Sequence, residues 1–325
     1  MSRMSRHVSQ RIRSGRFRGA AALRAVLAAL LLLPLPAAAN LYPSAVLEVE
    51  SQRLGPQIRT AYGEIRAAIP EFDQLRARDL RLSVPLDGPS PLYFGNRPDS
   101  QTVVIPVESV RFAEEFAQLD GLFEARGCDR GWLQSYARAL LGDGRDLPPP
   151  LEAFGLGQQD VADTPEAVQA GRDILGPVLR FLVAHEIGHL LRGDDRGPTE
   201  AHSLDEELNA DRFALDRFAD RRTRPEALDF YFLLERWADP GGEVAAAGVH
   251  PVSPERLQAL SDRLVRDGDL FRGFRSGDIG RWQIDVLAYD LSGMARLMRG
   301  GQLAPEQDDP RFDYPLHRMA DACPG

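Results

Sequence analysis

Apolar residues recur with helical spacing along the first part of the chain. In residues 43–80 they return every three or four positions, with interruptions at Gly55 and Pro56 and again at Pro70. This spacing is typical of amphipathic helices, and a Gly-Pro pair or a lone proline usually ends one. The pattern therefore predicts two or three helices in this region.

β-branched residues mark two short stretches after this helical region. Residues 80–86 (LRLSVPL) and 102–110 (TVVIPVESV) partly alternate, which predicts two strands of a small sheet. Residues 142–164 carry Gly, Pro and Asp at a density typical of a long loop. We expect this loop to separate an N-terminal region, 40–150, from a helical region, 151–325, unless the two form one domain. The expected fold is α+β, mainly helical, with a small sheet.

Residues 1–39 have the composition of a leader. Seven arginines and no acidic residue precede Asn40, and the apolar run Ala25–Leu33 is too short to span a bilayer. The sequence PLPAAAN then offers an A-x-A cleavage site that ends at Ala39. We therefore expect a secretory signal peptide cut after Ala39, with an uncleaved anchor as the alternative.

Loss of this leader makes the protein strongly acidic. It removes seven arginines and no acidic residue, which takes the formal net charge from −9 to −16. An acidic surface argues against nucleic acid and anionic lipid as partners. After the leader, no apolar run approaches membrane length, because Arg180 and His185 interrupt the longest one. We expect no integral membrane segment after leader removal, and a product in the periplasm or outside the cell.

The chain has two cysteines, Cys128 and Cys323, and both follow the leader. In an oxidising compartment they are able to pair and tie down the C-terminus, while two free thiols are the alternative. No cysteine for lipid attachment follows the leader.

One stretch, VAHEIGHLLRGDD at residues 183–195, carries most of the candidate chemistry. Gly176-Pro177 and Gly193 bound a helix expected over 177–192. Leucine, isoleucine and valine occupy nearly every face of that helix, which is typical of a helix inside the core. Histidines in such a helix need buried partners.

His185 and His189 lie four residues apart, one turn along the same helix face. Their Nε2 atoms are therefore able to converge on one metal ion at about 2 Å from each. Glu186, next to the first histidine, is placed to take a proton from a metal-bound water. The pattern predicts a catalytic zinc site. The alternative is a pair of core histidines satisfied by hydrogen bonds.

A catalytic zinc needs a third protein ligand and an open fourth position. Asp194 or Asp195 is one alternative for the third ligand. Downstream, Ser203 and Glu206 form a capping box that predicts the start of a second helix, and Glu207 falls in its first turns. We expect Glu207 to be the third ligand.

Asp211 lies four residues after Glu207 and so on the same helix face. It is well placed to bond the distal nitrogen of a ligand histidine and hold the ring in orientation. Ala210 and Ala214 on that face leave room for close helix packing. The alternative is that Glu207 and Asp211 belong to a solvated acidic face.

HEIGH and ELNAD, at residues 185–189 and 207–211, together resemble the gluzincin metallopeptidases, in which two helices supply His, His and Glu to zinc. Within that group the chain is most similar to the CAAX prenyl endopeptidases and related bacterial periplasmic and heat-shock proteases. A weaker similarity extends to GVHPVSPERLQAL at residues 248–260. The resemblance covers about 177–260 and implies a zincin-like core with His250 near the active-site rim. The absence of transmembrane helices after the leader departs from that family and leaves the substrate class open.

These observations predict a secreted zinc endopeptidase that holds one Zn²⁺ ion and acts on a protein or peptide substrate. Glu186 is the expected general base, and His250 is either a donor to the carbonyl oxygen in the transition state or a surface-loop histidine. Two other classes stay open. One is a zinc-binding chaperone or binding module with little turnover, and the other is an envelope interaction protein whose histidines are structural.

Overall fold

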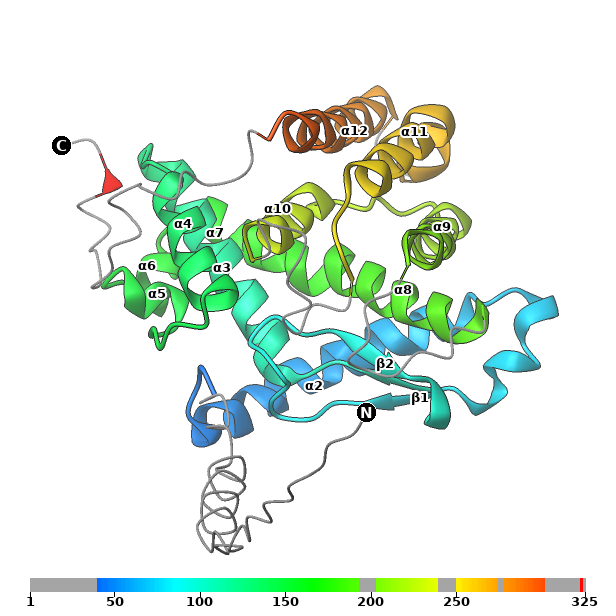
Figure 1. The fold of residues 1–325 in the computed structure, drawn as a ribbon, viewed down its shortest axis with the longest axis horizontal. Helices are drawn as coiled ribbons and strands as arrows, with labels where there is room; N and C mark the ends of the chain where they lie inside the picture. The colour runs from blue at the N-terminus through cyan, green and yellow to red at the C-terminus, as the bar shows by residue number, and fades with distance from the viewer. Residues whose placement is uncertain (1–39, 193–202, 239–249, 274–276, 302–321, 324–325) are drawn as a thin grey trace, which may run out of the picture. The chain divides into compact units, whose positions relative to one another are not determined.

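Helices dominate the architecture, as the apolar spacing predicts, and a small sheet packs against them (Figure 1). The structure is a computed structural model that describes residues 40–192, 203–238, 250–273, 277–301 and 322–323. The predicted leader, and with it the question of cleavage or anchoring, lies outside the described residues, as do Asp194 and Asp195.

The first helix, α2 (Ser44–Ala67), is longer than the sequence predicts. It passes through Gly55 and Pro56 without ending, so the predicted break there is wrong. A proline inside a helix costs about 3 kcal/mol. Leu54 and Ile58 on either side are fully buried, and burying two such side chains contributes a comparable or larger amount. Core packing therefore overrides the local signal.

The predicted interruption at Pro70 is present, since α2 ends before it. Two short 3-10 turns then lead into the sheet: η1 (Glu71–Asp73) and η2 (Arg76–Asp79).

The sheet has three short strands in the order β1-β3-β2, with β1 parallel and β2 antiparallel to β3. Both predicted strands are present but shorter than expected, and β2 comes from the turn-rich stretch between them. The sequence of β2, Gly-Asn-Arg, has no β-branched or aromatic residue, which explains why the sequence pattern does not predict it. The strands are β1 (Arg81–Ser83), β2 (Gly95–Arg97) and β3 (Thr102–Val104).

Residues 107–110, predicted to continue the second strand, instead form the first turn of α3 (Val107–Arg126). Pro106 lies between the strand and the helix in an extended conformation. Because proline has no N–H to donate to a ladder, it ends the strand, and the next residue starts the helix.

The predicted loop at 142–164 contains two single helical turns. It does not divide the molecule, because Asn40–Gly325 form one compact unit in which α3 packs closely on α7. Gly121 permits that approach, since a Cβ there would lie 2.7 Å from the Cα of Ala167. The elements of this part are α4 (Gly131–Ala137), η4 (Arg138–Gly142), α5 (Pro150–Ala153), α6 (Gln158–Ala162) and α7 (Pro165–Asp173).

The helix with the two histidines is the end of a longer run. A π-helical turn, η5 (Ile174–Val178), joins α7 to α8 (Leu179–Arg192), so the Gly176-Pro177 pair widens the helix rather than ending it. Among the described helices, Pro165–Arg192 is long and apolar enough to cross a bilayer, but 78% of its apolar window is buried inside the molecule. This burial is typical of a helix in the core of a protein.

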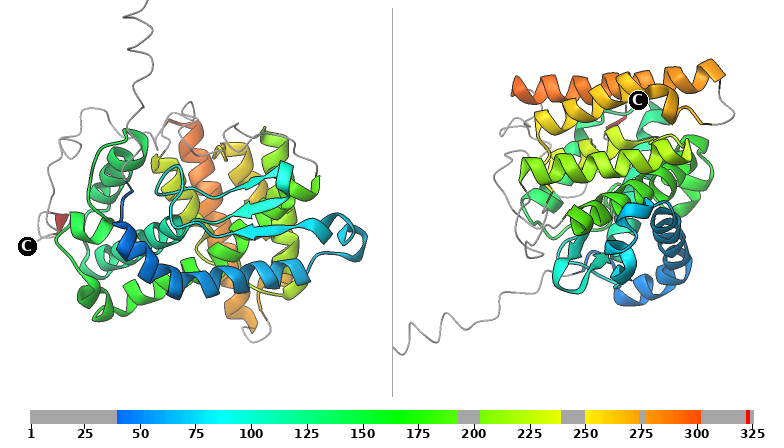
Figure 2. Two further views of the ribbon diagram at one scale, coloured as in Figure 1. Left: turned by 90° about the horizontal axis from the view of Figure 1, so that it is seen from below. Right: turned by 90° about the vertical axis from the view of Figure 1, so that its right-hand side faces the viewer.

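The remaining helices stack on α8 in layers. Figure 2 shows α2 and the sheet on one side of α8, α9 and α10 on the other, and the α11–α12 pair outermost. The predicted capping box at Ser203 is present, because the Ser203 N–H donates to Glu206 Oε2 at 2.6 Å and the Glu206 N–H donates to Ser203 Oγ. The helices are α9 (Leu204–Arg221), α10 (Leu228–Ala238), α11 (Pro254–Phe271) and α12 (Gly277–Arg299).

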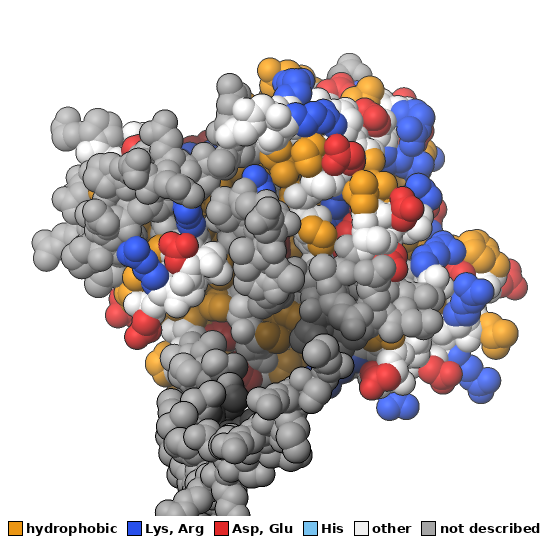
Figure 3. Space-filling model, viewed as in Figure 1, with side chains coloured by type: hydrophobic (Ala, Val, Ile, Leu, Met, Phe, Trp, Pro, Cys, Tyr) orange, Lys and Arg blue, Asp and Glu red, His pale blue; other side chains and the backbone are white. Residues whose placement is uncertain are grey.

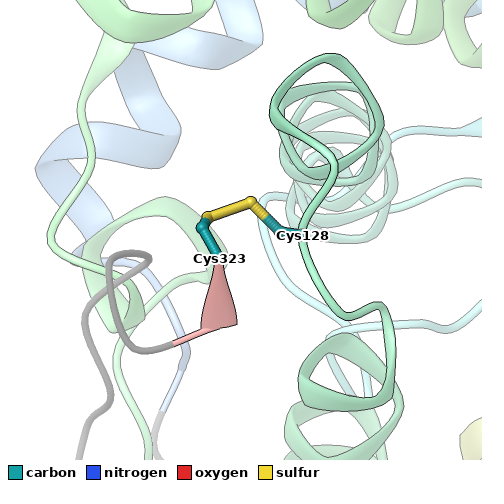
Figure 4. Close-up of a disulfide and its surroundings, with 2 residues drawn as sticks. All are labelled: Cys128 and Cys323. Atoms are coloured by element: carbon teal, nitrogen blue, oxygen red, sulfur yellow. A yellow bond between two sulfur atoms is a disulfide. The ribbon is translucent and has the colours of Figure 1, made fainter. Parts of the chain in front are cut away.

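Cys128 and Cys323 form a disulfide, so they are not two free thiols (Figure 4). The bond attaches the C-terminal segment to the end of α3, where the Asp129 N–H also donates to the carbonyl of Ala322 at 2.8 Å.

Candidate metal centre

α8 buries both motif histidines completely and points them the same way. His185 is 2% exposed and His189 is 1% exposed, and their Nε2 atoms lie 3.0 Å apart. The distance follows from the spacing of four residues on an α-helix. Two imidazole nitrogens are thus directed at one point.

Glu207, from the start of α9, reaches the same point. Its Oε2 lies 3.4 Å from His185 Nε2, and its Oε1 lies 3.5 Å from His189 Nε2. Small residues allow the two helices to come this close, because a Cβ on Gly188 would lie 3.0 Å from the Cα of Ala210. The structure therefore brings together the three residues that the sequence predicts as ligands.

Asp211 lies behind His185, as the sequence predicts. Its Oδ1 is 2.9 Å from His185 Nδ1, on the side of the ring opposite Nε2. A carboxylate in that position favours the tautomer whose Nε2 lone pair is free to bind a metal. Glu207 and Asp211 are both buried, so they do not form a solvated acidic face.

Arg256, on α11, joins the two carboxylates and was not recognised as a site residue from the sequence. Its guanidinium donates to Asp211 at 2.6 and 2.8 Å, and one nitrogen lies 2.6 Å from Glu207 Oε2. Burial acts to raise the pKa of both carboxyls, but the charge of Arg256 outweighs it and holds both below their ordinary range. The only signal in the sequence was its place six residues after His250 in the weak third block.

His250 lies inside the cluster rather than at its rim. Its Nδ1 is 3.2 Å from His185 Nε2 and 2.8 Å from Glu207 Oε1, and its Nε2 is 2.9 Å from Glu186 Oε1. Its side chain is 9% exposed, so it is not a surface-loop histidine. Burial acts to lower its pKa, while the charges of Glu186 and Glu207 raise it well above the ordinary value.

Glu186 is fully buried beside the cluster, and its two carboxylate oxygens face different residues. Oε2 accepts a hydrogen bond from Asn96 Nδ2 at 2.8 Å, and Oε1 faces His250. Burial acts to raise the pKa of Glu186, but His250 outweighs it and the pKa lies below the ordinary value. Asn96 comes from β2, the strand that the sequence did not predict, so no sequence pattern indicated this contact.

The donor set fits a metal ion. One nitrogen or oxygen from each of His185, His189, Glu207 and His250 lies within 4.8 Å of all the others. Ligands at about 2.0–2.1 Å in a tetrahedral zinc site are about 3.3 Å from one another, and in five of the six residue pairs here the donor atoms lie 2.8–3.5 Å apart. Imidazole nitrogens and a carboxylate are ligands that zinc accepts. This group is therefore able to hold a metal ion.

Comparison of the chain with protein-family models, curated proteins and solved structures gives no match. The resemblance to gluzincin peptidases thus stays a prediction from the sequence.

Proposed function

We propose that this protein is a zinc-dependent endopeptidase that hydrolyses peptide bonds with Glu186 as general base. The observation that carries the proposal is the convergence of His185, His189 and Glu207 on one point, with the Glu186 carboxylate buried at its edge. A purely structural metal site has no need of a buried carboxylate at its edge. The proposal includes a zincin-like core, in which α8 and α9 supply the ligands.

The chain's own residues divide the chemistry. A zinc ion bound in this cluster would supply Lewis acidity and lower the pKa of the attacking water. Glu186 accepts that proton and delivers it to the leaving amine. Asn96 holds Oε2 of Glu186 and leaves Oε1 directed at the cluster. Asp211 and Arg256 keep His185 and Glu207 in place.

His250 supports a second candidate, a zinc-binding module with little turnover. With Nδ1 of His250 among the donors, protein atoms fill four positions, and closed sets of four are typical of structural zinc. Peptide hydrolysis requires this ring to leave the donor set. We propose that the displaced ring then donates to the carbonyl oxygen of the substrate in the transition state, the role predicted from the sequence.

We also propose that the protein acts in the periplasm or outside the cell, on a protein or peptide. The Arg-rich leader supports export, and the disulfide supports an oxidising compartment.

The test measures zinc content and hydrolysis of an unstructured protein such as casein by the wild type and by Glu186→Gln, with Glu152→Gln on the surface as the matched control. For a peptidase, we expect zinc in all three proteins and activity in all but Glu186→Gln. Zinc without activity in the wild type would favour the binding module. Absence of stoichiometric zinc would overturn both and leave structural histidines.

His250→Ala separates the two roles of this ring. If it donates to the carbonyl oxygen, the variant should keep zinc and lose about 10²- to 10³-fold in kcat. If instead it mainly closes the fourth position, the variant should keep zinc and gain activity.

A further inference from the structure

Helix α12 is apolar on two opposite sides. At about 100° per residue, its buried side chains Ile284, Leu287 and Leu291 lie on the face that packs against α11 and α10. Trp282 and Tyr289 lie roughly opposite, and they are 65% and 68% exposed. A surface helix needs only one apolar stripe to join a core, so the second stripe is more apolar surface than the described fold requires.

The second stripe is continuous along the helix. Trp282, Val286, Tyr289, Gly293 and Leu297 fall within about 80° of one another around the axis. Val286 and Leu297 are 38% and 39% exposed, so these four side chains present apolar surface to solvent. Figure 3 shows hydrophobic side chains among arginines and acidic residues over α11 and α12. An exposed apolar patch rimmed by charge is typical of a protein interface.

Large side chains begin the stripe, and two glycines lie toward its C-terminal end. Gly293 follows Tyr289 by four residues, and Gly300 follows the end of the helix. A Cβ built on Gly293 meets only Arg296 Nη2, at 3.7 Å, so Gly293 leaves a hollow. If a second α12 lies antiparallel across the first and is centred at residue 291, Tyr289 of each copy faces Gly293 of the other. The same register places Trp282 opposite Gly300.

We propose that the exposed stripe of α12 pairs with the same stripe of a second copy of this chain, as an antiparallel two-fold dimer. In a two-fold interface the same surface must complement itself, and large residues facing glycines in this register satisfy that condition. The two tyrosines then pack near the axis, and the two tryptophans pack toward the ends.

Charge along one flank of the stripe agrees with this register. Asp285 and Arg296 lie on the same flank, at nearly equal distances from residue 291. In the dimer each Asp285 therefore approaches Arg296 of the other copy. In the single chain Asp285 and Arg296 are both exposed. Asp285 pairs with Arg281, and the Arg296 guanidinium lies over the Tyr289 ring. Because exposed contacts of this kind contribute little to stability, exchanging them for contacts across the dimer costs little free energy.

The net charge of the chain argues against a membrane surface as the partner of the stripe. The chain has a formal net charge of −9, which opposes binding to anionic lipid.

An α12 pair about 35 Å long buries on the order of 1,000 Å² in total, at the low end for specific interfaces. A reversible dimer with a Kd in the micromolar range is the expected result.

The first measurement is sedimentation equilibrium of the mature protein from about 1 to 200 µM, a range that brackets a micromolar Kd. We expect a monomer–dimer equilibrium in the wild type and monomer only in Tyr289→Arg. Phe72→Arg, an equally exposed aromatic change on η1, is the matched control and should dimerise as the wild type does. A wild-type protein that stays monomeric throughout this range overturns the proposal.

Disulfide trapping tests the register. Tyr289→Cys mixed with Gly293→Cys should form a mixed cross-linked dimer in higher yield than either variant alone. Cross-linking of Tyr289→Cys mainly with itself would indicate a different pairing and reject the antiparallel register. Sedimentation of monomer with vesicles of phosphatidylethanolamine and phosphatidylglycerol, abolished by Tyr289→Arg, would assign the stripe to lipid and also reject the dimer.

Discussion

Among the described residues, one cluster of buried charge lies along α3 and another lies between α8, α9 and α11. In the α3 cluster, Glu114 and Glu115 are almost completely buried. Arg53 donates to both oxygens of Glu114, and Arg111 lies 2.9 Å from Glu115, which also accepts a hydrogen bond from the hydroxyl of Tyr42 at 3.1 Å. Each carboxylate there has its own donors.

The second cluster is arranged differently. Asp211 and Glu207 share Arg256, but one atom from each of His185, His189 and Glu207 remains directed at a common point. Burial of charge is therefore common to both clusters and does not identify a site. Convergence of nitrogen and oxygen atoms from separate residues distinguishes the second cluster, because a metal ion is able to satisfy all of them together.

Removing a converging atom should have the largest effect. His185→Ala and His189→Ala should each abolish zinc retention, because α8 fixes both nitrogens beside Glu207, whereas His250 is the donor that turnover requires to leave. Zinc per chain, measured by inductively coupled plasma mass spectrometry after gel filtration, checks this. Glu114→Gln is the control from the α3 cluster and should retain zinc. Full occupancy in either histidine variant would remove the distinction between the clusters.

Breaking the α3 cluster should affect stability instead. Arg111→Ala leaves Glu115 buried without its cation, which should cost about 3–5 kcal/mol in the free energy of unfolding. Urea denaturation measures this loss, and zinc titration of the folded protein should show unchanged affinity. A large loss of zinc affinity would mean that the two clusters are coupled.

Asp211→Asn should have a smaller effect than loss of a ligand. The amide still occupies the place beside His185 Nδ1 but lacks the negative charge that supports the ring. Zinc affinity, measured by competition with a chelator, should fall by about 10- to 100-fold. Unchanged affinity would show that Asp211 serves only to neutralise Arg256.

The smallest expected effect concerns pH. Burial raises the pKa of Glu115, and Arg111 only partly opposes it. The folded state then binds a proton that the unfolded state has lost, so this group reduces stability as pH rises through its unfolded pKa toward its folded pKa. In urea denaturation, the free energy of unfolding of Glu115→Gln relative to that of the wild type should therefore be higher at pH 8 than at pH 5. The opposite order would contradict the sign.

The sequence predicted those parts of the centre that depend on local spacing. His185 and His189 converge because they lie four residues apart, and the capping box at Ser203 fixed the start of α9 and so the place of Glu207. Asn96 was not predicted, because it reaches Glu186 across 90 residues from a strand that has no β-branched or aromatic residue.

The errors in the fold have a similar origin. The break expected at Gly55 and Pro56 did not occur, because long-range burial of α2 outweighed a local signal. The mainly helical class with a small sheet is confirmed, since it depends on spacing summed over many residues. The role of Arg256 depended on how α11 packs against α9, which no local pattern encodes.

X-ray absorption at the zinc edge of the purified protein tests the central claim most directly. We expect one zinc per chain with nitrogen and oxygen neighbours at about 2.0–2.1 Å, imidazole scattering from His185, His189 and His250, and one imidazole fewer in His250→Ala. Protein that binds no stoichiometric zinc, or zinc whose imidazole scattering is undiminished after loss of both His185 and His189, would contradict the assignment of this cluster as the metal centre.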